Sequence, residues 1–191
     1  MQANPWPNVT ARSNFTTIVA EGLQQLFSQH TTLAVEQGCD SHKGACNKSS
    51  FDHYGCVCES NFSPDAVSAA VDEAEVVIVA LGTGTLTEAE GQDRNNLTLP
   101  GHQPAILAAA IAAKSASSKL ILLLFNAGGV VGSFGAGVDA IIAAGFPGQA
   151  TGLGIADVLS GKKGIAGRLA VTWPKALSQV PPIADYKLSA P

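Results

Sequence analysis

Charged residues are scarce in this chain of 191 residues, because only 14% of them are Asp, Glu, Lys or Arg, against about a quarter in an average soluble domain. Basic residues are not in excess either: the formal net charge is −4, which argues against a nucleic acid partner. No apolar run approaches the roughly 18 residues of a membrane-spanning helix. We therefore expect no nucleic acid partner, no membrane contact, and one packed domain with a sizeable core.

The chain also lacks a recognisable signal peptide, since residues 1–14 have neither a basic start nor an apolar centre. Two other features nevertheless favour an oxidising, extracellular or secretory environment. Four cysteines fall within a stretch of twenty residues. Five N-x-S/T sequons are present, at Asn8, Asn14, Asn47, Asn61 and Asn96. We therefore expect a fragment of a longer, secreted precursor.

The cysteines lie in a stretch, residues 39–63, that has no sustained periodicity and that we interpret as a disulfide-pinned loop. A zinc site that includes His42 and His53 is the alternative. Zinc ribbons usually carry two close cysteine pairs, each spaced C-x₂₋₄-C, whereas the only close pair here has one residue between its members. We favour disulfides, leave their pairing open, and expect no metal or other cofactor. The cysteines are Cys39, Cys46, Cys56 and Cys58.

Apolar runs alternate with helix patterns along most of the chain. Strands are expected at residues 31–35, 76–81, 119–125, 138–144 and 169–173. Helices are expected at residues 17–27, 63–73, 102–114 and 150–159, the second of them with an N-cap serine followed by proline. Such alternation predicts an α/β fold: a three-layer sandwich with a mainly parallel sheet covered by helices on both faces.

A dense polar segment follows the strand expected at residues 76–81, after a turn at Gly82 and Gly84. Ligands of open α/β sheets bind outside the carboxyl ends of the strands. The loops at residues 82–98, 126–137 and 145–150 should gather at that edge. The first of them carries Glu88, Glu90, Asp93 and Arg94, so the edge is a candidate site.

Four motifs in this order and spacing resemble glycoside hydrolase family 3. Residues 88–103 resemble its E-x-E-x-x-D-R…L-x-L-P-G-x-Q signature, and residues 145–149 its G-[YF]-P-G-Q turn. Residues 155–161 and 167–174 are similar to its I-A-D-V-L-x-G and G-R-L-P-x-T-W-P segments. The resemblance makes residues 63–175 the core of that family's C-terminal domain. Residues 1–62 would add an N-terminal segment, a helix, a strand and the cysteine loop, and residues 176–191 a tail.

The resemblance implies half of an active site. In that family a TIM-like barrel supplies an aspartate nucleophile, and the α/β sandwich often supplies the general acid/base from the glutamate loop. No segment here resembles the barrel, so a barrel domain is an expected partner. Retaining hydrolysis requires two carboxyl groups about 5–5.5 Å apart, one of which protonates the leaving oxygen. The expected substrate is a β-linked oligosaccharide or glycoside with a terminal xylosyl or glucosyl residue.

The motif favours Glu90 as the acid/base and leaves Glu88 as the alternative. In an extended loop both would face the same side. Asp93, Arg94 and Phe146 are candidate substrate-binding residues, although for Arg94 we favour a salt bridge with Asp93 that shapes the loop, and for Phe146 stacking on a sugar ring stays open. We expect Trp173 to pack in the core.

Two other functions compete with this interpretation. A nucleotide-binding module would rest on Gly82 and Gly84 after a strand, but Thr87 stands where a third glycine is required. A non-catalytic sugar-binding or docking module is the stronger alternative. Some acidic positions of the family pattern are lost, in residues 82–84 and 126–131, which would also fit an inactive copy.

Overall fold

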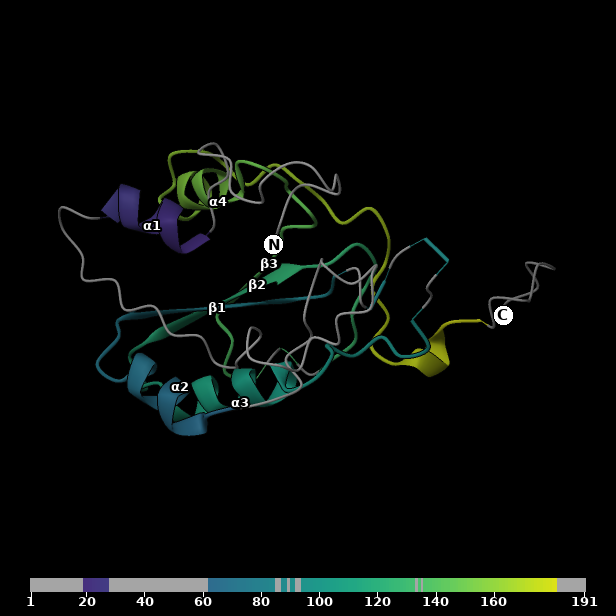
Figure 1. Cartoon of the computed structure of the whole chain (residues 1–191), viewed down its shortest axis with the longest axis horizontal. Helices are drawn as coiled ribbons and strands as arrows, with labels where there is room; N and C mark the ends of the chain where they lie inside the picture. Colours follow the sequence, from purple (N-terminus) through teal and green to yellow (C-terminus); the bar gives the residue numbers. More distant parts are fainter. Residues whose placement is uncertain are drawn as a thin grey trace, which may run out of the picture.

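The computed structural model describes residues 19–27, 62–84, 87–88, 90–91, 94–132, 134 and 136–181. Within them a parallel sheet forms from β1 (Val76–Gly82), β2 (Lys119–Phe125) and β3 (Ala140–Ala143), in the order β1-β2-β3 (Figure 1). Each strand therefore ends at the same edge of the sheet, as parallel topology requires.

The central strand supplies the most deeply buried part of the core. Four leucines of β2 have no exposed surface, namely Leu120, Leu122, Leu123 and Leu124. The strand reads as a continuous apolar run rather than an alternating one because both faces of the sheet are covered. Its register with β1 runs from Val76 opposite Lys119 to Gly82 opposite Phe125.

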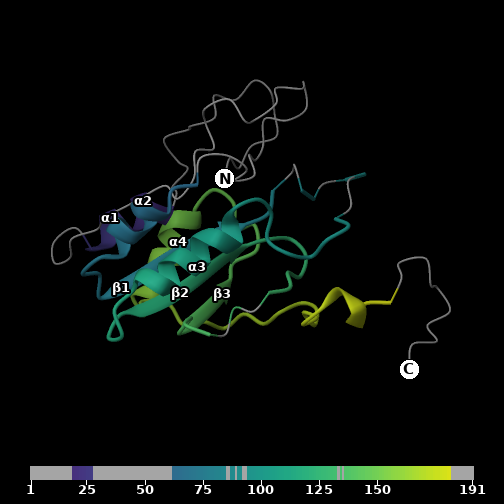
Figure 2. The same cartoon turned by 90° about the horizontal axis from the view of Figure 1, so that it is seen from below.

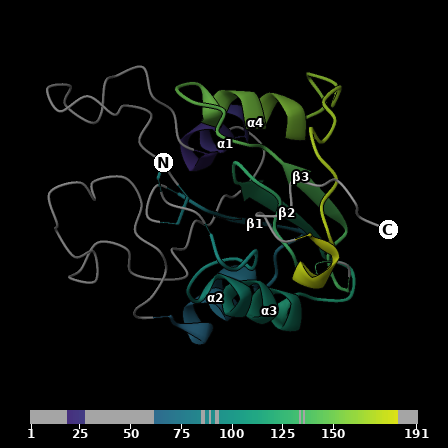
Figure 3. The same cartoon turned by 90° about the vertical axis from the view of Figure 1, so that its right-hand side faces the viewer.

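Helices cover the two faces in pairs. Figure 3 shows α2 (Pro64–Val71) and α3 (Gln103–Ala113) below the sheet, and α1 (Val19–Phe27) and α4 (Thr151–Leu159) above it. The predicted three-layer α/β sandwich is confirmed. Figure 2 shows that the short 3₁₀ helix η1 (Leu177–Gln179) lies apart from this layered body.

The predicted helix start at Ser63 is also present. The hydroxyl of Ser63 accepts a hydrogen bond from the amide of Ala66 at 3.2 Å, and Pro64 occupies the first turn. This arrangement satisfies one of the amides that a helix start leaves unpaired. On the other face, Gly22 of α1 meets Gly152 of α4 so closely that a Cβ on Gly22 would lie 2.1 Å from the Gly152 carbonyl oxygen.

Two predicted strands need correction. The strand expected at residues 169–173 is irregular, with Leu169 56% and Val171 59% exposed, because an apolar, alternating segment becomes a strand only when a neighbouring strand pairs with it. The strand expected at residues 138–144 is shorter: Val138 packs against the core and Asp139 bonds to the start of β2.

Other predictions lie outside the described residues, namely the strand at residues 31–35 and the cysteine loop. In the part of the chain that the structure describes, no helix has the length and apolar character needed to cross a bilayer.

Candidate active site

The end of β1 is held in place by a buried glutamine from the start of α3. Gln103 accepts a hydrogen bond from the Gly82 amide and donates one to the Gly82 carbonyl, each at 2.7 Å. Gly82 itself must be glycine, since a Cβ there would lie 2.1 Å from the Phe125 carbonyl oxygen. Sequence reasoning quoted Gln103 as a motif residue and assigned it no role. The sequence signal that could have indicated a role for Gln103 is a polar side chain at the start of a helix, next to apolar residues.

Hydrogen bonds join Gly84 to Thr87 and Glu88 directly afterwards. The amides of Thr87 and Glu88 both donate to the Gly84 carbonyl, at 2.8 and 2.9 Å, and the Thr87 hydroxyl accepts from the Gly84 amide at 3.0 Å. The expected extended conformation, which would turn Glu88 and Glu90 to one side, involves Ala89, which lies outside the described residues. The environments of the two glutamates differ.

Glu88 is largely buried, and both of its carboxylate oxygens are engaged. Oε1 accepts hydrogen bonds from the Thr83 hydroxyl and from the Ala127 amide, the latter at 2.8 Å. Oε2 lies 2.9 Å from Nε of Arg94. Only 13% of the Glu88 side chain and 11% of the Arg94 side chain are exposed. Glu88 thus acts as a hydrogen-bond acceptor inside the fold.

Arg94 connects this loop to the turn after β2. Its Nη2 donates to the Gly129 carbonyl at 2.9 Å while its Nε contacts Glu88. A Cβ on Gly128 would lie 2.8 Å from Nη2, so the guanidinium passes directly over the turn. Arg94 therefore forms a salt bridge with Glu88, whereas the sequence suggested its neighbour Asp93 as the partner. Asp93 lies outside the described residues.

Glu90 has the opposite environment. It lies exposed in a turn beside Gly91, whose φ of 74° favours glycine. Within the described residues no hydrogen bond or ion pair of its carboxylate is found. A carboxyl group in such a place is available to a ligand. Phe146 is also accessible, 48% exposed in the loop after β3, although its use as a sugar platform stays a prediction.

Two polar atoms beside the Glu88–Arg94 pair are buried and have no hydrogen-bond partner among the described residues: Nη1 of Arg94 and Oδ1 of Asn126. Asn126 is only 4% exposed, and its Nδ2 donates to the Gly128 carbonyl. Orphaned buried atoms are rare, and each one costs stability. The sequence places Asn126 in the turn after β2 and gives no signal that its side chain is buried.

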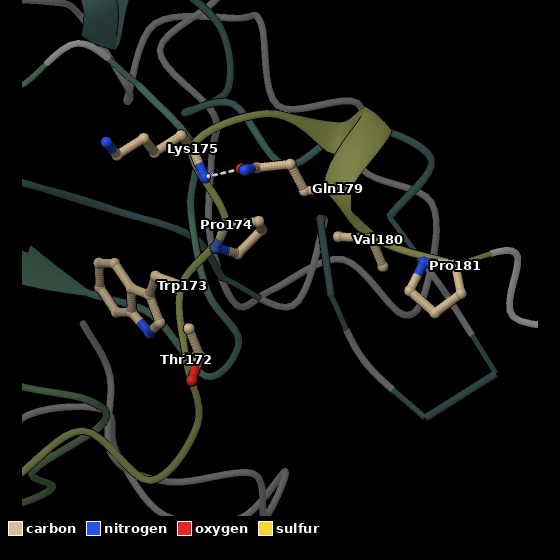
Figure 4. A pocket seen from close by; sticks show the side chains of 7 residues that line it. All are labelled: Thr172, Trp173, Pro174, Lys175, Gln179, Val180 and Pro181. Atoms are coloured by element: carbon tan, nitrogen blue, oxygen red, sulfur yellow. Dashed lines mark hydrogen bonds between the residues drawn. The ribbon is translucent and has the colours of Figure 1, made fainter. Parts of the chain in front are cut away.

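Trp173 supports the same turn from the C-terminal side. The indole packs against the main core, as predicted, and a Cβ on Gly129 would lie 3.2 Å from it. Trp173 also lines an open hollow of about 530 Å³. Figure 4 shows Gln179 turned toward the backbone of Lys175 across this hollow, where its Oε1 accepts from the Lys175 amide at 2.7 Å.

The comparisons with known proteins agree with this architecture. The family model described as "Glycosyl hydrolase family 3 C-terminal domain" matches residues 2–190. The chain belongs to that family. The predicted family and the predicted domain are therefore both confirmed.

Relatives of this glycosyl hydrolase family 3 domain include plant and fungal enzymes. The chain is 35% identical over 122 residues to beta-D-xylosidase 1 of Arabidopsis thaliana, which covers 62% of the chain and 16% of the relative. It is 36% identical over 124 residues to exo-1,4-beta-xylosidase of Emericella nidulans, covering 62% and 15%. The chain thus spans less than a fifth of the length of these two relatives.

A solved structure gives the same result. The family 3 beta-glucosidase of Bifidobacterium adolescentis superposes with a TM-score of 0.56 at 30% identity, covering 66% of this chain and 19% of that one. In this glycosyl hydrolase family 3 domain, Glu88 is engaged and Glu90 is exposed, and both follow β1 at the carboxyl edge of the sheet.

Proposed function

We propose that this chain is the domain of a secreted retaining β-glycosidase that supplies the general acid/base, and that Glu90 is that residue. The observation that carries the proposal is the contrast between the two glutamates. Glu90 is exposed on the loop after β1, whereas both oxygens of Glu88 are engaged by Thr83, Ala127 and Arg94. A proton donor must reach the leaving oxygen of a substrate, so the accessible glutamate is the better candidate.

The reaction needs a second carboxylate, which a TIM-like barrel domain would bring. That carboxylate attacks the anomeric carbon while the bond to the leaving oxygen breaks, and Glu90 donates its proton to that oxygen. Glu90, now ionised, then takes a proton from the water that hydrolyses the glycosyl–enzyme ester. We expect terminal β-D-xylosyl or β-D-glucosyl residues as substrates, because xylosidases and glucosidases are among the relatives.

The test is a chimeric enzyme in which this chain replaces the matching segment of the Emericella nidulans exo-1,4-beta-xylosidase. Glu90→Gln should lower kcat/KM about 10²- to 10⁴-fold for xylosides with poor leaving groups. It should affect a dinitrophenyl xyloside far less, because that leaving group departs without protonation. Glu75→Gln, on an exposed residue at the opposite edge of the sheet, is the matched control. An equal loss on both substrates would contradict the assignment.

The second candidate function is a non-catalytic carbohydrate-binding or docking module. It is favoured by the loss of acidic residues in residues 82–84 and 126–131. In that case xylo-oligosaccharides would bind to the chain, while the chimera would have no activity even with Glu88 and Glu90 both unchanged. The extracellular location is part of the proposal and is supported by the sequons and cysteines.

A further inference from the structure

We propose that Glu88 and Arg94 form a positioning pair that holds the turn after β2 against the loop carrying Glu90. This inference rests on the proposed function, because it assigns to the pair the task of orienting the acid/base. Neither residue is a catalytic residue in this proposal. Both act through the backbone they hold.

The contacts of the pair join segments that are distant in sequence. Glu88 accepts from the amide of Ala127, 39 positions later in the chain. Arg94 contacts Glu88 through Nε and the Gly129 carbonyl through Nη2, both at 2.9 Å. The guanidinium is planar and its donors have fixed directions, so the two contacts set the orientation of the turn as well as its distance.

The pair also flanks Glu90 in the sequence. Glu88 and Arg94 stand two positions before and four positions after it. Glu88 is anchored at the end of β1 through Thr83, and Arg94 is anchored to the turn after β2. Glu90 therefore lies between two residues that are each held against a rigid element. A proton donor needs such support, because it must meet a substrate atom to within a fraction of an ångström.

The unpaired atoms in the cluster favour a functional role over a purely stabilising one. Among the described residues, Nη1 of Arg94 and Oδ1 of Asn126 are buried and have no hydrogen-bond partner. Such atoms are uncommon in folded proteins, and departures from full hydrogen bonding are expected at functional sites.

Gly128 offers a way to disturb the pair without changing any charge. Nη2 of Arg94 passes so close that a Cβ on Gly128 would lie 2.8 Å from it, and 4.0 Å from Oε2 of Glu88. Gly128→Ala should therefore displace the guanidinium while leaving both charged groups in the chain. Arg94→Lys is the complementary variant, because it keeps the charge and removes the planar, two-directional donor.

The first measurement is hydrogen exchange at the Ala127 amide of the 191-residue chain, which needs no enzymatic activity. Arg94→Lys and Gly128→Ala should each accelerate that exchange at least about tenfold, because the amide loses a fixed acceptor. Arg168→Lys, on an exposed arginine, is the matched control and should leave the exchange unchanged. Exchange at Ala127 that is the same in all three variants would overturn the proposal.

The second measurement uses the chimeric enzyme. Arg94→Lys should lower kcat/KM about 10- to 100-fold for xylosides with poor leaving groups and have little effect on kcat/KM for the dinitrophenyl xyloside. Added to Glu90→Gln, it should cause no further loss, because a misplaced donor no longer matters once the donor is gone. If Arg94→Lys lowered kcat/KM equally on both substrates, or if its effect added fully to that of Glu90→Gln, the pair would be only a structural contact.

These outcomes separate the two proposals. If Glu90→Gln lacks the leaving-group dependence, the proposed function fails, while the exchange at Ala127 still tests whether the pair holds the turn. If Glu90→Gln has that dependence and Arg94→Lys does not, the function stands and the positioning role fails.

Discussion

Polar side chains at the two ends of the sheet differ in their exposure to water and in their hydrogen bonding. At the amino ends of the strands, Asp139 accepts from the Leu120 amide at 2.9 Å and from Lys119 at 3.1 Å, and the ions remain partly in water, with 34% of Asp139 and 68% of Lys119 exposed. At the carboxyl ends, the Glu88–Arg94 pair is almost enclosed, and Nη1 of Arg94 has no partner in the part of the chain that the structure describes.

This difference distinguishes an edge built from partly hydrated ions from an edge built around an enclosed ion pair. The amino edge uses exposed ions and a buried serine, Ser118, whose hydroxyl donates to the Ala74 carbonyl at 2.6 Å, to tie strands together at small cost. The carboxyl edge places a charged pair where desolvation is costly. Within the described residues, part of the hydrogen-bonding capacity of this pair is unused. Such an arrangement is hard to explain by stability, and it lies beside the exposed glutamate.

The largest expected effect comes from breaking the pair at the carboxyl edge. Glu88→Ala leaves a buried, uncompensated arginine and an unpaired Ala127 amide, so the free energy of unfolding should fall by about 3–5 kcal/mol. Urea denaturation followed by circular dichroism measures it. Glu75→Ala, on an exposed carboxylate, is the control. A loss below about 1 kcal/mol would mean that the carboxyl edge is no more sensitive than a surface ion pair.

A second, smaller effect is expected at the end of β1. Gln103→Leu keeps a side chain of similar volume but removes both hydrogen bonds to Gly82. Because it leaves a partly buried amide and carbonyl unpaired, the free energy of unfolding should fall by about 1–3 kcal/mol. Thermal unfolding of the variant beside Gln149→Leu, on an exposed glutamine, measures the difference. Equal stability of the two variants would show that Gly82 finds other partners.

At the amino edge, the expected effect is one of pH. The hydrogen bond from the Leu120 amide, followed by the contact with Lys119, holds the pKa of Asp139 below its ordinary value of 3.8. A lowered folded-state pKa stabilises the fold above the ordinary value, and this stabilisation is lost as the pH falls through the folded-state pKa. Asp139→Asn should therefore be less stable than the parent chain at pH 6, and the gap should narrow below about pH 3.8.

Thermal unfolding of both proteins between pH 6 and pH 2.5 checks that prediction. A gap that stays constant across this range would show that Asp139 acts through hydrogen bonding alone, with no contribution from its charge.

The smallest effect should come from Lys119. Its side chain is largely exposed where it contacts Asp139, and exposed ion pairs contribute about 0–1 kcal/mol. Lys119→Ala should therefore change the free energy of unfolding by less than about 1 kcal/mol, and any change should shrink in high salt, which screens exposed charges. A loss as large as that of Glu88→Ala would remove the contrast between the two edges.

Much of the fold was predictable because its signals are local. The range expected for β2, residues 119–125, is the range found, and α2 begins at Ser63 and Pro64 as expected. The predicted elements that the structure corrects are those that depend on a distant partner. Residues 169–173 have the alternation of a strand, yet no ladder forms there, because pairing is decided by what lies beside the segment and not by its own pattern.

The candidate site divides in the same way. Its location after β1 followed from the turn at Gly82 and the acidic residues behind it. The roles of Asn126 and Gln103 did not, because each depends on contacts with residues from another part of the fold. The cysteine loop and Asp93 stay predictions.

The α/β class, the family, the order of the described elements and the loop that carries the two glutamates all follow from the amino-acid sequence, because periodicity and motif spacing are properties of neighbouring residues. That Glu88 is enclosed and Glu90 exposed follows from the folded arrangement. The partners of Glu88 include the Ala127 amide, which approaches the loop only after β1 and β2 have paired in register and brought their carboxyl ends to one edge. Burial of a charge depends on that assembly, and no local pattern encodes it.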